Sequence, residues 1–402
     1  MSSRGLFARG SRRFAPFIVP ALVSAALGCG EDADSPTGLE PATLETTVEL
    51  ALSFVQISAG GQHSCGVTAD DRVYCWGYNY FGQLGDGTTT NRLTPVRVNT
   101  GGLRFRRVDA GTYHTCGVTP DRKAYCWGGN FYGQLGDGTT SQRPTPVAVA
   151  LGLQFRLVRA GNGSTCGVTP QDQAYCWGNN QFGQLGDGTE TNRLTPMRVA
   201  GLLPFRQLSA SFDQTCGVTT DNRGYCWGYN PYGQLGDGTR IKRLTPVAVA
   251  GGLQFDRVVT GGVSTCGVTL DDRAYCWGDN FSGQLGDGTN TQRLVPTAVA
   301  TGLRFSGVAV GGGHACGVTP GDLVYCWGSN FLGKLGDGTV EDRLTPVAVS
   351  GGLRLNYLSA SAHTCGVTSQ GRAYCWGHNY FGQLGDGTTQ HRLRPRRVAG
   401  SV

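Results

Sequence analysis

The sequence lacks the motifs that mark the common catalytic sites. It has no G-x-S-x-G element, no phosphate-binding loop of the G-x-x-x-x-G-K-[ST] type and no H-E-x-x-H pair. These absences argue against a serine hydrolase of the usual kind, a P-loop enzyme and a zinc peptidase. We therefore expect a protein that is not an enzyme and that needs no cofactor.

Clustered basic residues are scarce as well. The formal net charge is +6, but four arginines lie in the first 13 residues. The only later cluster contains Arg392, Arg394, Arg396 and Arg397. Nucleic-acid-binding domains normally carry a much larger basic patch. We interpret this run as a solvated strand edge and expect no nucleic acid among the partners.

The composition is also poor in hydrophobic residues for a protein built of long helices. Hydrophobic residues make up 39% of the chain, and glycine contributes 65 of the 402 residues. The glycines stand at fixed places in a repeated pattern, so they mark turns rather than low complexity. Many short strands separated by polar turns fit this composition better than helices.

One stretch organises the chain and occurs seven times. Its first copy runs Tyr-Cys-Trp-Gly from Tyr74 and continues as Gly-Gln-Leu-Gly-Asp-Gly-Thr over Gly82–Thr88. Successive copies are separated by about 50 residues, a period that indicates a propeller, a solenoid or an array. The later copies of Tyr-Cys-Trp-Gly begin at Tyr125, Tyr175, Tyr225, Tyr275, Tyr325 and Tyr374.

Alternating apolar and polar residues predict four short strands in each repeat. In the second repeat they cover residues 103–108, 114–119, 123–127 and 144–149. Four short antiparallel strands repeated seven times predict an all-β fold, a seven-bladed β-propeller. A β-solenoid is the alternative, although its coils are usually shorter than about 50 residues.

The first 28 residues have the pattern of an export signal. A basic start is followed by an apolar run over residues 14–27 that is too short to span a bilayer. The run leads to Cys29 and resembles a bacterial lipoprotein signal, with Ala26 where leucine is usual. We expect Cys29 to become the lipidated N-terminus. An ordinary secretory signal is the alternative.

The rest of the chain divides into a linker and the repeats. Residues 29–50 carry six acidic and no basic residues and are expected to form a flexible tether. Alternation over residues 46–52 suggests an extra strand that helps to close a ring. Residues 51–402 are expected to form the propeller, with repeats at about 54–100, 101–150, 151–200, 201–250, 251–300, 301–350 and 351–399.

The repeated motif resembles that of a known family. Cys-Gly-Val-Thr, a turn, Tyr-Cys-Trp-Gly-x-Asn-x-x-Gly-Gln-Leu-Gly-Asp-Gly-Thr and a later Pro-x-x-Val are similar to the regulator of chromosome condensation repeat, over about residues 54–399. The resemblance implies a seven-bladed propeller. It does not imply the activity of the nuclear founding member, because fold does not fix function. A secreted enzyme inhibitor with the same repeat acts purely by binding.

Fourteen of the 15 cysteines form pairs that are ten residues apart. In the first hairpin, a turn centred on Asp70 places Cys65 opposite Cys75 on one face of the sheet. Zinc would need close Cys-x-x-Cys pairs or a metal shared between repeats. We predict seven cross-strand disulfides: Cys65–Cys75, Cys116–Cys126, Cys166–Cys176, Cys216–Cys226, Cys266–Cys276, Cys316–Cys326 and Cys365–Cys375.

Other repeated residues are interpreted as structural. Each repeat has one tryptophan, which we expect to pack between neighbouring blades; a sugar-binding platform is the alternative. Each Asp-Gly-Thr aspartate precedes an arginine by six residues, as Asp86 precedes Arg92, and we predict an ion pair there rather than a calcium site. One repeat position holds histidine four times, with a metal or proton site as the alternative to a hydrogen-bonded structural role: His63, His114, His314 and His363.

The repeat varies most in the loop after Tyr-Cys-Trp-Gly. If these loops lie on one rim, their aromatic side chains form a surface of the kind that protein interfaces use. The alternative is that the rings wedge between blades. The candidate binding residues are Tyr78, Tyr80, Phe81, Phe131, Tyr132, Phe182, Tyr229, Tyr232, Phe281, Phe331, Tyr380 and Phe381.

Together these features predict an exported, lipid-anchored and monomeric propeller that binds an unknown protein or ligand. Its expected place is the bacterial outer membrane or cell surface, with the periplasm or secretion as the alternative. A hydrolase or lyase with its site at the propeller channel is a second hypothesis. Guanine-nucleotide exchange is a third, but the export signal argues against an intracellular partner.

Overall fold

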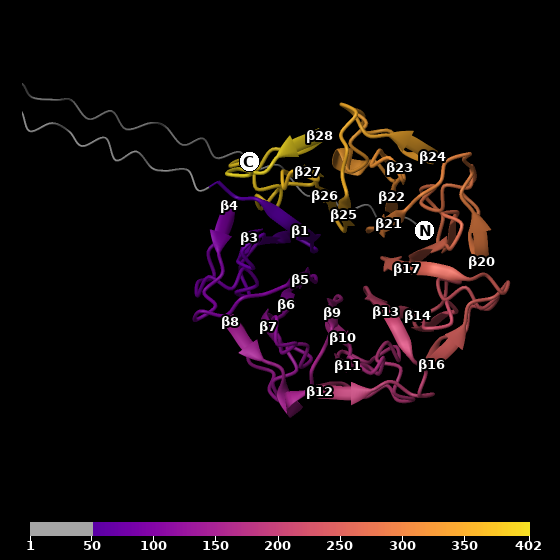
Figure 1. Ribbon diagram of the computed structural model, residues 1–402. Helices are drawn as coiled ribbons and strands as arrows, with labels where there is room; N and C mark the ends of the chain where they lie inside the picture. Colours follow the sequence, from indigo (N-terminus) through magenta and orange to yellow (C-terminus); the bar gives the residue numbers. More distant parts are fainter. Residues whose placement is uncertain (1–50) are drawn as a thin grey trace, which may run out of the picture. The chain divides into compact units, whose positions relative to one another are not determined.

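A computed structural model describes residues 51–402. The proposed signal, Cys29 and the acidic tether lie outside the described residues. The described part contains seven four-stranded antiparallel sheets arranged as blades of a ring (Figure 1). The predicted all-β, seven-bladed propeller is therefore confirmed.

Each blade is formed by four consecutive strands, ordered from the centre of the ring to its edge (Figure 1). The first blade contains β1 (Phe54–Ala59), β2 (His63–Thr68), β3 (Val73–Gly77) and β4 (Arg92–Arg97). The second contains β5 (Arg107–Ala110), β6 (His114–Val118), β7 (Ala124–Gly128) and β8 (Arg143–Ala148). The third contains β9 (Leu157–Ala160), β10 (Ser164–Val168), β11 (Ala174–Gly178) and β12 (Arg193–Arg198).

The remaining blades repeat this order. The fourth contains β13 (Phe205–Ala210), β14 (Gln214–Thr219), β15 (Gly224–Gly228) and β16 (Arg243–Ala248). The fifth contains β17 (Phe255–Gly261), β18 (Ser264–Thr269), β19 (Ala274–Gly278) and β20 (Arg293–Ala298). The sixth contains β21 (Gly307–Val310), β22 (His314–Val318), β23 (Val324–Gly328) and β24 (Arg343–Ala348). The seventh contains β25 (Tyr357–Ala360), β26 (His363–Val367), β27 (Ala373–Gly377) and β28 (Arg392–Arg397), and two 3-10 turns, η1 (Ala150–Gly152) and η2 (Phe331–Gly333), lie in loops.

The first strand of a blade begins later than the sequence suggests. In the second blade, β5 starts at Arg107, whereas alternation predicted a start at Leu103. The Phe105 N–H donates to the Asp71 carbonyl of the preceding blade, 2.9 Å away, and the equivalent bond is also made by Phe205 and Phe255, where β13 and β17 begin. Residues 103–105 connect two blades, and pairing with β6 begins where the Arg106 N–H donates to the Val118 carbonyl at 2.9 Å.

The middle two strands of each blade are buried and are joined by a disulfide. Cys65 lies directly opposite Cys75 in the ladder between β2 and β3, and the other six pairs have the same register. All seven predicted disulfides are present, and the fourteen cysteines are fully buried. Each disulfide closes a short hairpin within one blade, so it stabilises the blade and not the ring.

The hydrophobic core lies between blades. In each of seven clusters, the inner face of one blade packs against a tryptophan and the innermost strand of the next. All seven tryptophans are fully buried, which confirms their structural role. Six of them donate their indole N–H to a backbone carbonyl of the preceding blade at 2.9–3.1 Å, as Trp277 donates to Gln234.

A glycine of the preceding blade makes room for each indole. Gly186 has φ +70°, and a Cβ there would lie 2.6 Å from the indole nitrogen of Trp227. The six equivalent glycines place a Cβ equally close to their tryptophans, at 2.6–2.7 Å. The first glycine of Gly-Asp-Gly is therefore required both by the backbone conformation and by the contact between blades.

The first and last described residues close the ring. The Leu52 N–H donates to the Gly400 carbonyl at 2.6 Å, and the Val402 N–H donates to the Leu52 carbonyl at 3.2 Å. This parallel bridge joins blade 1 to the end of blade 7. The Trp76 indole also donates to Gln383 at 2.9 Å, so the last junction repeats the contact of the others.

The contact between tryptophan and glycine can be tested at one junction. We expect Gly186→Ala to lower the free energy of unfolding by about 1–3 kcal/mol more than Gly188→Ala, because the new methyl group displaces Trp227. Gly188 is the matched control: it also has positive φ (+85°), but a Cβ there meets nothing closer than Thr245 at 3.8 Å. Denaturant unfolding measures both variants. Equal destabilisation would show that backbone strain alone matters.

Candidate binding face

Each blade contributes two connections to one face of the ring. The turn after the first strand and the long loop between the third and fourth strands lie together, since the Tyr78 N–H donates to the Gln62 carbonyl at 2.9 Å. Equivalent bonds recur in other blades, as between Gly129 and Tyr113 at 2.8 Å. We call this surface the loop face. Its long loops cover residues 78–91, 129–142, 179–192, 229–242, 279–292, 329–342 and 378–391.

A repeated polar network gives each long loop its shape. In blade 1, the Asn79 amide donates to Asp86 at 3.2 Å and its carbonyl accepts from the Leu84 N–H at 2.9 Å. Asp86 also accepts from Thr88 and forms an ion pair of 2.8 Å with Arg92. The predicted Asp–Arg pair is present in all seven blades, with distances of 2.6–2.9 Å.

The network keeps its aspartates ionised. Burial by itself would raise the pKa of Asp86, but the hydrogen bonds from Thr88 and Arg92 outweigh it and hold the pKa below its usual value. The other six aspartates of this position have lowered pKa values for the same reasons. These carboxylates are therefore structural, and their lone pairs are used within the loop.

The candidate aromatic residues divide into two kinds. The first residue of the variable pair is exposed wherever it is aromatic, from 50% at Phe131 to 84% at Phe281. Other rings, at the place after Tyr-Cys-Trp-Gly or second in the pair, pack across the junction, as Phe381 packs on Tyr78 with ring centroids 4.7 Å apart. Tyr132 and Tyr232 are second in the pair but are exposed, at 43% and 36%. Five residues of this second kind are half-buried: Tyr78, Phe81, Phe182, Tyr229 and Phe381. Some candidate rings are thus exposed on the loop face and others pack between blades.

Aromatic rings meet in one continuous group on blades 7, 1 and 2. Phe81 is at its centre, with centroid distances of 5.0 Å to Tyr80, 5.4 Å to Tyr113 and 5.1 Å to Phe131. Tyr78 links this group to Phe381 of blade 7. Tyr113 was not among the predicted residues, because it lies in a different turn that only the fold brings close. We call these residues the aromatic cluster: Tyr78, Tyr80, Phe81, Tyr113, Phe131 and Phe381.

The loops around the aromatic cluster carry no free charge at neutral pH. In blades 1 and 2 the only acidic residues of the long loops are Asp86 and Asp137, and both are paired. Blade 7 adds His378 and His391, whose pKa values are lowered by burial, that of His378 to about 4. Charged residues of the long loops stand in the other blades, for example Glu190, Arg240, Lys242, Glu341 and Asp342.

The other candidates are more scattered. Phe182 and Tyr229 form a pair across the junction of blades 3 and 4, with centroids 4.7 Å apart. Among the described residues, Tyr232, Phe281 and Phe331 contact no other aromatic ring. Tyr380 instead packs against His391, 4.5 Å away. The structure thus concentrates the predicted rim in one sector of the loop face.

The four repeated histidines link neighbouring blades. His63 Nε2 lies 2.8 Å from Thr115 Oγ1, and that hydroxyl donates to the Gln83 carbonyl at 2.8 Å. Because the hydroxyl proton is used, Nε2 must carry the histidine proton. His114 and His314 make the same contact with a threonine of the next blade, and His363 makes it with Ser64 Oγ at 2.6 Å. The histidines are hydrogen-bonded structural residues, and the described residues contain no group of three or more His, Cys, Asp or Glu side chains that could hold a metal ion.

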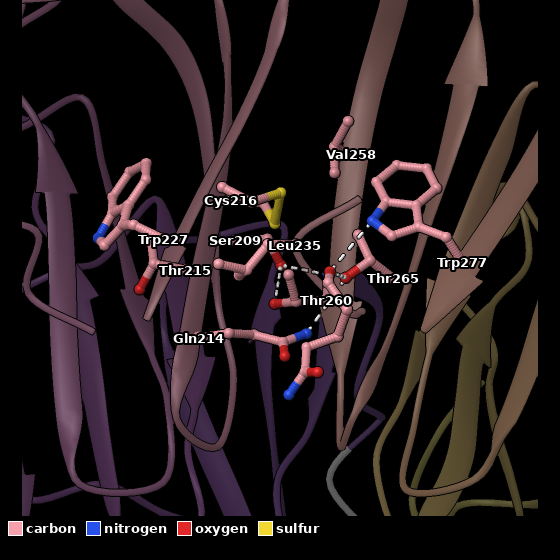
Figure 2. Close-up of a disulfide and its surroundings, with 12 residues drawn as sticks. Ser209, Gln214, Thr215, Cys216, Trp227, Leu235, Val258, Thr260, Thr265 and Trp277 are labelled. Atoms are coloured by element: carbon pink, nitrogen blue, oxygen red, sulfur yellow. Dashed lines mark hydrogen bonds between the residues drawn. A yellow bond between two sulfur atoms is a disulfide. The ribbon is translucent and has the colours of Figure 1, made fainter. Parts of the chain in front are cut away.

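Burial makes these histidines resistant to protonation. It lowers the pKa of His63, His114 and His363 to about 3, and lowers that of His314 well below its ordinary value. In blade 4 a glutamine replaces the histidine, and Gln214 donates to Thr265 at 3.2 Å (Figure 2). Gln214 thus shows that a neutral glutamine can replace the histidine at this position of the repeat.

The central channel contains residues that the sequence analysis did not single out. The innermost strands line a cavity of about 760 Å³. Asp109 of blade 2 and Arg159 of blade 3 form an ion pair of 2.9 Å there, and the Ala160 N–H also donates to Asp109. Burial raises the pKa of Asp109, and the Arg159 charge opposes that rise. The sequence did contain one sign of this pair. The position varies between repeats, and it holds Ser58 in the first, Asp109 in the second and Arg159 in the third.

The sequence profile of the regulator of chromosome condensation (RCC1) repeat matches most of the chain. One form of the profile matches residues 54–83, 105–134, 155–184, 205–234, 255–284, 305–334 and 361–383. A second form matches residues 70–118, 123–168, 171–218, 221–267, 271–318 and 322–368. The second form begins in the hairpin of one blade and ends in the next, so the sequence unit spans a junction.

Relatives with a described role resemble parts of this chain. The ultraviolet-B receptor UVR8 of Arabidopsis thaliana is 37% identical over 124 residues, which are 31% of this chain and 27% of the receptor. The human E3 ubiquitin-protein ligase HERC2 is 39% identical over 106 residues, which are 25% of this chain and 2% of the ligase. The chain thus spans only a small part of the length of these relatives.

Solved structures show the same fold. Prp20p of Saccharomyces cerevisiae, a structure described together with its binding to Gsp1p and histones, aligns with a TM-score of 0.74 at 19% identity, over 83% of this chain and 87% of that one. Human WBSCR16 aligns with a TM-score of 0.71 at 22% identity, over 78% of this chain and 86% of that one. At these identities the likeness shows the fold alone.

The buried histidines predict acid sensitivity. Their folded pKa lies below the unfolded value of 6.5, so the unfolded chain binds more protons below pH 6.5 and stability falls as pH drops towards 3. The loss is up to about 1.4 kcal/mol per pH unit for each histidine. We expect His114→Gln to make this dependence shallower and Gln214→His to make it steeper. The denaturant midpoint of unfolding is measured at pH 7 and at pH 5 for the parent and for each variant. If the midpoint falls equally in all three proteins, the buried histidines are not the source of the acid sensitivity.

Proposed function

The chain belongs to the regulator of chromosome condensation repeat family, and from this we propose that it is an exported interaction protein whose aromatic cluster binds another protein. The observation that carries the proposal is the cluster itself. It is the place on the loop face where the seven-fold repeat is broken by adjoining rings, from Phe381 through Phe81 to Phe131.

The physical character of the cluster supports a protein partner. Aromatic side chains are enriched at the centres of interfaces, where they bury a large area with few rotatable bonds. The side chains of Tyr80 and Phe131 are 65% and 50% exposed. The ring of Tyr80 packs against Tyr78, and the ring of Phe131 packs against Phe81. The rings are thus already packed against one another before binding, which would lower the entropy cost of association. Binding of Prp20p to Gsp1p and histones is a precedent for partner binding by this fold.

Export is supported by the cysteines. Seven buried disulfides form and persist in an oxidising compartment. We propose that residues 1–28 direct export and that Cys29 is lipidated, which would hold the propeller at the outer membrane or cell surface. None of the helices in the described part of the chain is long and apolar enough to cross a bilayer.

The channel offers less support for the hydrolase or lyase hypothesis. The Asp109 carboxylate is occupied by the Arg159 guanidinium and by the Ala160 N–H. A general base would need a free lone pair directed at a substrate. Exchange of guanine nucleotides would require an intracellular partner, which an exported protein does not meet.

The aromatic cluster can be tested by position-specific photo-cross-linking. With benzoylphenylalanine in place of Tyr80 or Phe131, we expect adducts with one partner in intact cells, because these exposed rings would lie within the interface. The same probe at Phe281, which occupies the equivalent position in blade 5 and is 84% exposed, should give none. Mass spectrometry identifies the adduct. Adducts at Phe281 alone would place the interface elsewhere on the ring.

The dissociation constant for the identified partner measures how much each exposed ring contributes to binding. Tyr80→Ala and Phe131→Ala should each weaken binding by about tenfold or more, as expected for truncated hot-spot residues. Phe281→Ala should leave the dissociation constant within about twofold. A similar loss in all three variants would indicate a general effect on the loop face and would count against the cluster.

The anchor is tested separately. Cys29→Ser should abolish incorporation of radiolabelled palmitate and move the protein from the membrane fraction to the soluble fraction, because a thioether-linked lipid needs the cysteine. Fractionation of parent and variant measures the shift. A parent protein that is soluble and unlabelled would favour the ordinary secretory signal.

A further inference from the structure

The outermost strand of blade 7 differs from the other six. The sequence of β28 is Arg-Leu-Arg-Pro-Arg-Arg, whereas β16 and β24 both read Arg-Leu-Thr-Pro-Val-Ala. Within residues 51–402, the first arginine alone has an ion-pair partner, since Arg392 binds Asp386 at 2.6 Å, as the equivalent arginine does in the other six blades. Arg394 and Arg396 depart from all the other blades, and they stand beside Arg397, whose place is also held by arginine in β4 (Arg97) and β12 (Arg198).

Arg396 occupies a position that is apolar in most blades. Val96, Val147, Val247 and Val347 hold this place elsewhere, and each packs against a core cluster. Arg396 is exposed instead and gives up that packing. A residue that departs from the repeat pattern and gains no structural contact is a candidate for a functional role.

The three arginines are available to an external ligand. Arg394, Arg396 and Arg397 are exposed, and none forms an ion pair with any residue in the described range. Arg396 and Arg397 line a cleft of about 320 Å³ together with Ala51 and the last residues of the chain. The Arg394 guanidinium lies over Gly338 of blade 6, so the positive charge extends along the circumference of the ring.

The location of this edge suggests what it meets. Ala51 lines the same cleft, and Leu52 is bonded to Gly400, so the chain joins the ring beside the arginines. β28 lies on the circumference, so contact there would leave the loop face accessible (Figure 1). Basic clusters beside a membrane anchor bind phosphate groups of anionic lipids.

We propose that Arg394, Arg396 and Arg397 form a docking edge for an anionic lipid surface. The choice of a membrane rests on the proposed lipid anchor at Cys29. The arginines supply charge-assisted hydrogen bonds to lipid phosphates, for which the planar guanidinium is suited. The edge would then orient the propeller at the bilayer, while the aromatic cluster faces a partner.

Vesicle sedimentation tests the edge without the anchor. The full chain with Cys29→Ser is mixed with vesicles of phosphatidylglycerol and phosphatidylethanolamine, or of phosphatidylcholine alone. We expect binding to the anionic vesicles only, weakened by salt. Changing Arg394→Thr, Arg396→Val and Arg397→Ala gives β28 the sequence of β16, and should lower the partition coefficient about fivefold per arginine, on the order of 100-fold together.

A charge-matched control separates the edge from overall charge. Arg106→Gln, Arg107→Gln and Arg198→Ala remove three other exposed arginines and should leave partitioning within about twofold. Thermal unfolding checks that both triple variants are folded. Equal losses in the two variants, or equal binding to phosphatidylcholine, would overturn the proposal.

Two competitors distinguish other anions from a lipid surface. Inorganic phosphate should displace the protein no better than sodium chloride of the same ionic strength. Specific displacement by phosphate would indicate a discrete phosphate site and would overturn the proposal of a lipid surface. Tighter binding to duplex DNA than to the vesicles would also overturn it. Because every arm uses Cys29→Ser protein, a negative result here leaves the test of lipidation unaffected.

Discussion

The packing of a tryptophan against a bare glycine of the neighbouring blade is the contact on which the ring depends. No blade can bury its own tryptophan, since the surface that covers Trp227 is the Gly-Asp-Gly turn at Gly186 of the preceding blade. Each blade is therefore completed by the next, as in other repeat proteins. The bridge between Leu52 and Ser401 matters for the same reason, because it gives the last blade a neighbour.

Stabilisation within blades and between blades is divided between different groups. The disulfides act locally, within one hairpin, and the histidine–threonine bonds act across junctions. The junction of blades 5 and 6 shows that the polar contacts are replaceable. Ser264 bonds within its own blade and Ala315 stands where other blades have threonine or serine, while Val259 and Val310 pack in that core cluster. Apolar packing substitutes for hydrogen bonds at this junction.

The repeat also separates the structural polar groups from the two surfaces proposed for binding. Most repeated polar groups have partners within the ring, from the Asp–Arg pairs to the histidine Nε2 atoms. In the described range, the four histidine Nδ1 atoms and the Nε2 atoms of four repeated glutamines have no hydrogen-bond partner, but they are buried. Groups free to meet a ligand are the ones that break the repeat: the aromatic cluster on the loop face and the arginines of β28. These two surfaces belong to blades 7, 1 and 2, the sector in which the ring closes.

The sequence by itself determined the number of blades, the strand content, the disulfide pairing and the Asp–Arg pairs, because each follows from short-range spacing that recurs seven times. The register of the ladder depends only on the ten-residue spacing of Cys65 and Cys75. Tertiary structure alone decided which aromatic residues meet. Tyr113 joins Phe81 only because a turn of blade 2 lies beside a loop of blade 1, and Asp109 meets Arg159 only because innermost strands converge at the channel. Contacts across a junction involve residues about 30 to 50 positions apart, and no local pattern specifies which non-repeated side chains the ring will place side by side.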